Sequence, residues 1–193
     1  MSEIKKLSEL GSNQLSQAVG VFVEGFYNIL SSITKDKGKL HDIFKHSLNR
    51  NANYAYLQNG QAVGFLGIRD SESRPLKLNK EVFLASVGGL AGKFAYKMTS
   101  SALENVPPPK PNETYIDYLA IAPAHRGQGI GTKLIEYAKD SSQSEYLMIQ
   151  VLSKNVGAKK LYERRGFSTV EAKINLLTML KCFGRPITMK MKI

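Results

Sequence analysis

The residues with the clearest chemical potential form a glycine-rich turn at positions 126–132. Glycines let a ligand approach the backbone closely, and the first amides of a helix have no acceptor within the helix. Several N–H dipoles can therefore converge on an anion at such a place. The turn predicts a binding site for a diphosphate, although a plain turn from strand to helix is the alternative. Its sequence is Arg126-Gly127-Gln128-Gly129-Ile130-Gly131-Thr132.

The spacing of these glycines narrows the kind of phosphate ligand. A dinucleotide turn needs the pattern G-x-G-x-x-G, and a Walker loop needs G-x-x-x-x-G-K-[ST]. Residues 126–131 instead read R-x-x-G-x-G. Neither common nucleotide-binding pattern fits, so the sequence favours a different phosphorylated cofactor.

A second motif lies at residues 155–167 and contains Asn155, Ala158, Leu-Tyr-Glu at 161–163 and Gly-Phe at 166–167. Together with the R-x-x-G-x-G turn, which follows a strand ending in Ala-Pro, it resembles the GNAT superfamily of N-acetyltransferases. The two motifs span about residues 115–170, and the N-terminal part of the chain is similar only in pattern. The resemblance implies an acyltransferase of the EC 2.3.1 class with acetyl-CoA (coenzyme A) as co-substrate.

In this superfamily the pantetheine arm of acetyl-CoA lies between the splayed fourth and fifth strands of an open sheet. The resemblance implies that strand backbone holds the arm, that helix amides hold the pyrophosphate, and that Arg126 adds a cation. Asn155 is carried over as a contact to the pantetheine or to a water there, although helix capping alone would also explain an asparagine. The implied cofactor-binding residues are Leu119, Ala120, Ile121, Arg126, Gly127, Gln128, Gly129, Ile130, Gly131, Thr132, Asn155 and Tyr162.

Direct transfer of an acetyl group to an amine needs a base, a polarised carbonyl and an acid for the leaving thiolate. Positions 115, 117 and 119 share one face of an alternating strand, and the resemblance implies that Asp117 stands where several family members carry an acidic or histidine base. Asp117 is therefore the expected base, with Glu113 in reserve. A structural carboxylate is the alternative role for Asp117. A backbone N–H at a bulge near residues 119–121 is expected to polarise the carbonyl. Tyr162 is expected to protonate the thiolate, unless its ring only packs in the groove.

The chain has a net charge of +11, and residues 154–193 contain ten Lys or Arg and two Glu. Such basic charge favours a polyanion, and coenzyme A is one. Solvated surface explains most of it, and a nucleic-acid or ribosome-associated protein is a further alternative, although no helix-turn-helix, zinc-finger or RNP signature occurs. A non-catalytic sensor that binds acyl-CoA is another alternative function. The single cysteine and the three histidines have no metal-ligand spacing, so no metal is expected.

Amphipathic patterns predict helices at residues 14–33 and 40–48, which in this superfamily flank the acceptor site. Residues 53–58 and 62–69 predict strands joined by Asn59-Gly60, the dipeptide of a type I′ hairpin turn. Small amines, antibiotics, amino acids, polyamines and protein amines all stay open as acceptors.

A long segment, residues 70–114, separates this hairpin from the strand before the glycine turn and is expected to carry structure of its own. Residues 79–103 predict one helix, broken or kinked near Gly88-Gly89 and buried or pocket-lining, and a stiff proline-rich return follows at 107–111. The segment is interpreted as a lid or acceptor pocket, or else as a packing insertion or a dimer contact.

The C-terminal part predicts strands at 115–121 and 146–152, a helix starting at Ile130, a helix at 155–165 ended by Gly166, and closing strands at 167–174 and 187–193. The expected fold class is α/β, a GNAT-type fold with a mostly antiparallel mixed sheet of about six or seven strands, flanked by helices. Residues 1–193 are expected to form one domain with an insertion at about 70–114. We also expect the protein to be cytoplasmic and to have no membrane span, with a homodimer as a possible assembly.

Overall fold

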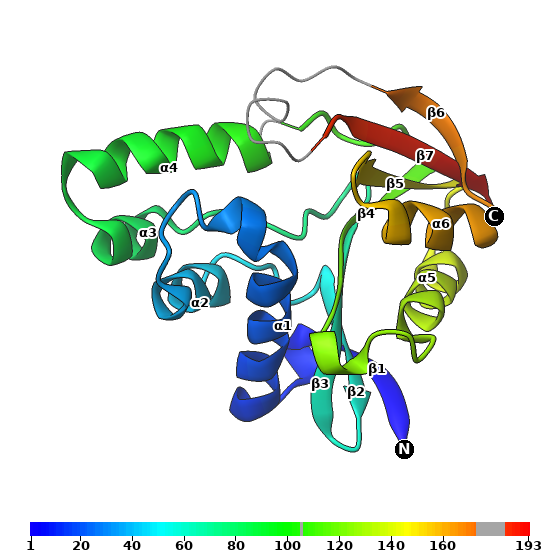
Figure 1. Cartoon of the computed structure of the whole chain (residues 1–193), viewed down its shortest axis with the longest axis horizontal. Coiled ribbons are helices and arrows are strands. Elements are labelled where there is room, and N and C mark those ends of the chain that lie inside the picture. The colour runs from blue at the N-terminus through cyan, green and yellow to red at the C-terminus, as the bar shows by residue number, and fades with distance from the viewer. Residues whose placement is uncertain (105, 173–183) are drawn as a thin grey trace.

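A computed structural model describes residues 1–104, 106–172 and 184–193, with only the backbone of residues 171 and 172. Its strands form one seven-stranded sheet in the order β1-β2-β3-β4-β5-β7-β6 (Figure 1). Neighbouring strands are antiparallel, except that β4 and β5 are parallel. The expected mixed fold is therefore confirmed. The strands are β1 (Ser2–Lys6), β2 (Asn53–Gln58), β3 (Gln61–Arg69), β4 (Glu113–Ile121), β5 (Tyr146–Leu152), β6 (Ser168–Ala172) and β7 (Pro186–Lys192).

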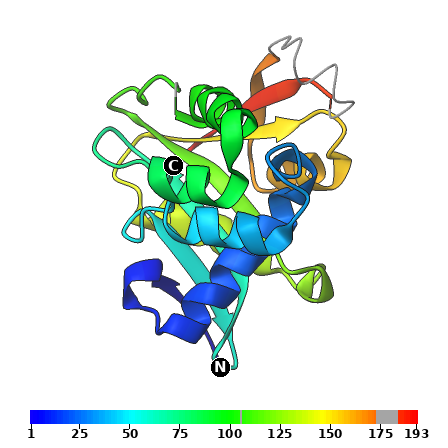
Figure 2. The same cartoon turned by 90° about the vertical axis from the view of Figure 1, so that its left-hand side faces the viewer.

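Helices cover both faces of this sheet, and each face has its own apolar core. Phe22, Phe44 and Phe65 are buried on the face covered by α1 and α2, whereas Leu134 and Leu147 are buried on the α5 face. Figure 1 shows α1 to α4 on one side of the sheet and α5 and α6 on the other, and Figure 2 views the molecule from the α4 side. The described helices are α1 (Ser12–Leu30), α2 (Lys37–Lys45), α3 (Lys80–Val87), α4 (Gly89–Glu104), α5 (Ile130–Ser141) and α6 (Val156–Arg164).

Short-range signals in the sequence correspond to the observed turns. Asn59 and Gly60 join β2 to β3 with φ angles of 52° and 78°, which is the conformation that a type I′ turn requires at both central residues. Gly166 follows α6 with a φ of 93°, as a left-handed helix end favours. Both predictions are confirmed by these angles. The sequence was sufficient here because each turn depends on residues close together in the chain.

The sheet opens between β4 and β5. The two strands are paired from Glu113 and Tyr146 to Ile116 and Ile149, but not beyond, although β4 continues to Ile121 and β5 to Leu152. The expected splay of the fourth and fifth strands is therefore present.

A bulge in β4 corrects the expected alternation along this strand. Gly67 is paired with Tyr118 and the next residue, Ile68, with Ile116, so Asp117 is the extra residue. As a result Ile116 packs in the α5-side core, whereas Tyr118 contacts the α1-side core. The bulge was expected near residues 119–121, and positions 115, 117 and 119 were expected to share a face. Both expectations are wrong, because the pairing with β3 places the extra residue earlier.

Two helices, α3 and α4, occupy much of the segment between β3 and β4. They meet at Gly88 and Gly89, whose φ angles are 76° and 60°, so the expected break is confirmed. The helix was expected to be buried or pocket-lining. Tyr96 and Ser100 of α4 do line a cavity beside α3, but another face of α4 is exposed. Leu90, Phe94 and Met98 are 83%, 68% and 46% exposed. They recur every four residues on one helix face, and that stripe points away from the core contacts that Tyr96 and Leu103 make.

Part of the closing-strand prediction falls on residues 173–174, and Cys182 also lies outside the described residues. Among the residues that the structure describes, no helix is long and apolar enough to cross a membrane. In the same residues, no group of three or more His, Cys, Asp or Glu is placed to hold a metal ion. The cellular location and the oligomeric state stay predictions.

Candidate active site

Two cavities adjoin β4 and meet where β4 and β5 part. The first, here called the α5 groove, has a volume of about 750 Å³ and is lined by β4, the glycine turn, α5 and α6. The second, here called the α1 cavity, has a volume of about 630 Å³ and is lined mainly by α1, β4 and β5. Molecules held in the two cavities can therefore approach each other at the residues that line both. These junction residues are Gly25, Leu119, Asn155 and Tyr162.

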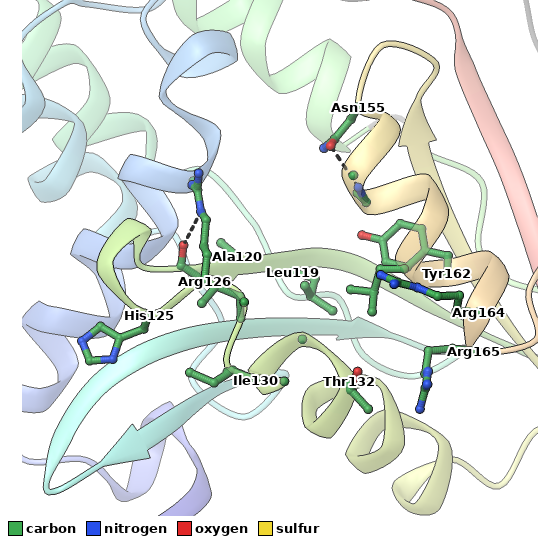
Figure 3. Close-up of a pocket in the computed structure, with 18 residues that line it drawn as sticks. Leu119, Ala120, His125, Arg126, Ile130, Thr132, Asn155, Tyr162, Arg164 and Arg165 are labelled. Carbon is green, nitrogen blue, oxygen red and sulfur yellow. Dashed lines mark hydrogen bonds between the residues drawn. The ribbon is translucent and has the colours of Figure 1, made fainter.

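The glycine turn lies at the head of the α5 groove and leads into α5. Gly127 and Gly129 both have a φ of 78°, a left-handed conformation that favours glycine. The N–H of Lys133 donates to the carbonyl of Gly129 at 3.1 Å and begins the hydrogen bonding of α5. The amides of residues 129–132 precede this bond, so they stand at the positive end of the helix dipole without helical acceptors. Figure 3 shows Ile130 and Thr132 at this start of α5.

The space around the turn fits a phosphate group. A Cβ atom added at Gly127 or Gly129 would have no heavy atom within 4 Å, so the space beside this backbone is open. A Cβ atom added at Gly131 would lie 3.0 Å from Cδ2 of Leu161, which shows that α6 packs directly against the start of α5. A pyrophosphate can therefore lie against the backbone amides, as anions do at helix N-termini.

Positive charge surrounds the same groove. In the described part of the chain its lining includes Arg126, Arg164 and Arg165. The Nε of Arg126 donates to the carbonyl of Ile121 at 3.3 Å. The sequence prediction missed Arg164 and Arg165, although they follow Leu161 by three and four residues in α6, a spacing that shares a helix face. These guanidinium groups give the groove the charge that a polyanionic ligand needs.

The floor of the groove is β4 at residues 119–121. Leu119 and Ala120 are paired with Leu66 and Phe65 of β3 on one edge. On the other edge, the described strands provide no partner for β4 beyond Ile116. Backbone N–H and C=O groups need partners, so this edge can hydrogen-bond to an extended ligand.

Tyr162 projects from α6 into the junction. Its residue is 5% exposed, and its ring packs 5.9 Å from that of Phe167, measured between centroids. Burial raises the pKa of Tyr162 to about 12, so the phenol stays protonated at neutral pH. Within the described residues its hydroxyl has no hydrogen-bond partner, and Figure 3 shows it directed toward the space between Leu119 and Asn155. The hydroxyl is thus placed to donate to a ligand.

Asn155 is the N-cap of α6. Its side-chain oxygen accepts a hydrogen bond from the N–H of Ala158 at 3.2 Å (Figure 3). This is the capping role that the sequence left open. Because Asn155 also lines both cavities, capping holds its side chain at the junction.

Asp117 lies in the α1 cavity and is bound by Arg69. Nε and Nη2 of Arg69 donate to the two carboxylate oxygens at 2.8 and 3.1 Å. Arg69 also donates to the carbonyl of Pro107 at 2.8 Å, which ties the pair to the segment after α4. Burial raises the pKa of Asp117, and Arg69 opposes that effect. The geometry supports the structural carboxylate that was the alternative for Asp117, and it leaves the role of base as a prediction.

The remaining predicted residues divide between the groove and its surroundings. All the predicted cofactor-binding residues except Gln128 line the groove. The side chain of Gln128 instead donates to the carbonyl of Ala124 at 3.4 Å. Glu113, the reserve base, lines neither cavity, and its carboxylate lies 3.8 Å from the amino group of Lys110.

Comparisons with known proteins agree with this architecture. The sequence matches the acetyltransferase (GNAT) family over residues 23–167. No match to a curated protein was found by sequence. Among solved structures, an N-acetyltransferase from Staphylococcus aureus Mu50 superposes with a TM-score of 0.64 at 17% identity, covering 97% of this chain and 99% of that one. The ribosomal-protein-S18-alanine N-acetyltransferase from Escherichia coli gives 0.56 at 17% identity, covering 100% and 94%.

A third structure, the NatC complex bound to Gag peptide and CoA, matches with a TM-score of 0.55 at 16% identity, covering 100% of this chain and 98% of that one. At sequence identities this low, the structural matches show that the fold is shared and show nothing more. The family match, together with the open mixed sheet and the glycine turn beside the parting strands, identifies an enzyme of the acyltransferase class. The chain belongs to the acetyltransferase (GNAT) family, whose members use acetyl-CoA.

Proposed function

We propose that the protein transfers an acetyl group from acetyl-CoA to a primary amine by direct attack in a ternary complex. The observation that supports this most is the junction, where the α5 groove and the α1 cavity share Leu119 and Tyr162. The four junction residues include no Ser, Thr or Cys, so they offer no ordinary nucleophile for an acyl-enzyme. Two substrates that meet there would react with each other.

The α5 groove is the proposed site for coenzyme A. The amides of residues 129–132 would hold the pyrophosphate, and the unpaired edge of β4 at 119–121 would bind the pantetheine arm. The cations Arg126, Arg164 and Arg165 would add attraction for the phosphates. Part of the basic charge near the C-terminus would thereby serve the cofactor rather than nucleic acid.

The proposed reaction exchanges one bond for another. The amine nitrogen bonds to the acetyl carbon, the carbon–sulfur bond breaks, the nitrogen loses one proton and the thiolate gains one. Tyr162 would donate a hydrogen bond and then a proton to the sulfur, since its hydroxyl is protonated and directed into the junction. An amide N–H of the bulged β4 strand would polarise the acetyl carbonyl.

Asp117 is retained as the proposed base for the amine. It is the one carboxylate among the described residues that line the two cavities. A carboxylate has about four lone-pair sites, of which the bidentate bond from Arg69 uses two. The lone pairs that remain can accept a proton from the amine directly or through a water, and a raised pKa makes the carboxylate a stronger base.

Two measurements test this proposal. Thermal unfolding with excess acetyl-CoA should occur at a higher temperature, because a ligand that binds the folded state stabilises it. Release of free thiol should then be measured across a panel of amines. Binding without amine-dependent thiol release would instead identify a non-catalytic acyl-CoA sensor. The absence of any thermal shift would contradict the whole proposal.

A further inference from the structure

We infer that the acceptor of this enzyme is a primary amine with a single positive charge on an apolar, aromatic or aliphatic body. The inference rests on the proposed acetyl transfer and names the substrate class of the α1 cavity. It follows from the walls of that cavity, from its charges and from an exposed residue at its edge.

Aromatic and aliphatic side chains form one part of the wall of the α1 cavity. Phe22, Phe26 and Tyr118 line it together, and the Tyr118 ring meets the two phenylalanine rings edge-on, at 87° and 80°, with centroids 5.2 and 5.5 Å away. Leu152 of β5 adds a further apolar residue to the lining, whereas Asn28 of α1 and Gln150 of β5 add polar side chains. Such walls gain free energy by removing an apolar body from water, and aromatic edges and faces pack well against another ring.

The charges of the lining do not suit a polycation. Asp117 is its one carboxylate among the described residues, and the lone pairs that Arg69 leaves free are the ones proposed to serve the reacting amine. Lys154 adds a positive charge to the same lining. Residues 173–183, which are not described, contain two lysines and no acid in their sequence. A second ammonium group would therefore find no free carboxylate, and an unpaired charge is costly to place against apolar walls.

An exposed apolar residue at the edge of the cavity agrees with this class of acceptor. Ile29 on α1 lines the α1 cavity, yet 40% of its surface is exposed. The cavity volume of about 630 Å³ falls within the range of about 300–1,000 Å³ that is typical of small-molecule sites. A bound apolar body would cover Ile29 and would leave the amine to reach the junction.

The test compares acceptors that carry one amine with acceptors that carry several. Acetyl transfer is measured with phenethylamine, hexylamine, spermidine and kanamycin, and with a tripeptide that begins with phenylalanine. We expect kcat/KM for phenethylamine to exceed that for spermidine at least tenfold. A ratio at or below one would overturn the inference. If the enzyme acetylates the tripeptide but none of the small amines, the inferred kind of acceptor is supported and polypeptide N-termini are its source.

A binding measurement separates failure of this inference from failure of the proposed function. Ligand-observed NMR with phenethylamine and spermidine needs no turnover. If no amine is acetylated, the proposed function fails, but tighter binding of phenethylamine would still support the apolar cavity. Tighter binding of spermidine would overturn it.

A charge placed at the cavity edge sharpens the test. Ile29→Glu should lower kcat/KM for phenethylamine about tenfold and narrow its advantage over spermidine, because the new carboxylate can pair with a second ammonium. The matched control is Met98→Glu on α4, which makes the same change in charge at a residue that is 46% exposed and lines neither cavity. Equal effects of the two variants on the ratio would count against the assignment.

Discussion

The hydroxyl of Tyr162 provides the sharpest test of the proposed chemistry, because Tyr162→Phe removes one atom from the junction. The ring stays in place against Phe167, and the hydroxyl has no partner among the described residues. No described group loses a hydrogen-bond partner when this hydroxyl is removed, so the free energy of unfolding should change little. A role in catalysis would then appear in turnover alone.

The size of the effect follows from the pKa. Burial raises the pKa of Tyr162 to about 12, whereas an ordinary thiol has a pKa of about 8.5. Complete proton transfer to a thiolate is therefore uphill, so the hydrogen bond to the developing charge, which precedes that transfer, accounts for most of the effect on kcat. Such a bond contributes about 1.5–3 kcal/mol. At about 1.4 kcal/mol for each factor of ten, kcat should fall about 10- to 150-fold.

The assay combines kcat with a good acceptor, acetyl-CoA affinity by calorimetry and thermal unfolding. We expect a loss of kcat with unchanged affinity and an unchanged shape of the pH profile below about pH 11, since the phenol stays protonated there. Tyr137→Phe is the matched control, because Tyr137 is partly buried on α5 and lines neither cavity. Unchanged kcat in Tyr162→Phe would refute the acid role and leave the ring as packing.

Three further changes test the architecture around the site. Gly129→Ala forces a side chain into a φ of 78°, so stability should fall by about 1–2 kcal/mol and acetyl-CoA affinity should drop in melting and calorimetry. Gly60→Ala, at the same φ of 78° in the hairpin turn, should lower stability in the same way but leave the affinity unchanged. Arg69→Met leaves the buried carboxylate of Asp117 unpaired and should cost about 3–5 kcal/mol. Because the pKa of Asp117 is raised, the folded state binds more protons than the unfolded chain between about pH 4 and the raised pKa, so stability should decline across that interval and level off above it. Loss of Arg69 should raise the pKa further and extend the decline, and melts at a series of pH values that show no decline in either protein would contradict this. Gly25→Ala would place its Cβ 2.5 Å from Cβ of Ala120. This overpacking should lower the stability by about 1–3 kcal/mol and shift α1 away from β4. Melting should show the loss of stability, and steady-state kinetics should show a lower kcat.

Features encoded by neighbouring residues were predictable from the sequence. The Asn59-Gly60 turn and the break at Gly88-Gly89 depend on local backbone preferences, which act whatever the rest of the chain does. The proposed cofactor side of the site is also local in part. Its turn and its first helix amides lie within residues 126–132, so spacing along the chain is enough to identify them.

Features that depend on distant partners were not predictable in this way. Asp117 and Arg69 are 48 residues apart in sequence, and nothing near Asp117 indicates that a guanidinium occupies both of its oxygens. The exposure of Phe94 was missed for a related reason. An apolar stripe predicts that a helix has an apolar face, but the position of α4 relative to the sheet decides whether that face is covered.

The bulge at Asp117 connects these distant partners to the chemistry. Without the extra residue, strict alternation from Ile116 would turn Tyr118 toward the α5-side core. With it, Tyr118 packs against Phe22 and Phe26 in the α1 cavity, and Leu119 contacts the α5-side core and lines the junction. One inserted residue thus lets a single strand provide an aromatic wall for the proposed acceptor and a backbone floor for the cofactor. Because register with β3 fixes the bulge, β3 controls the alignment of the two proposed substrates although it lines neither cavity.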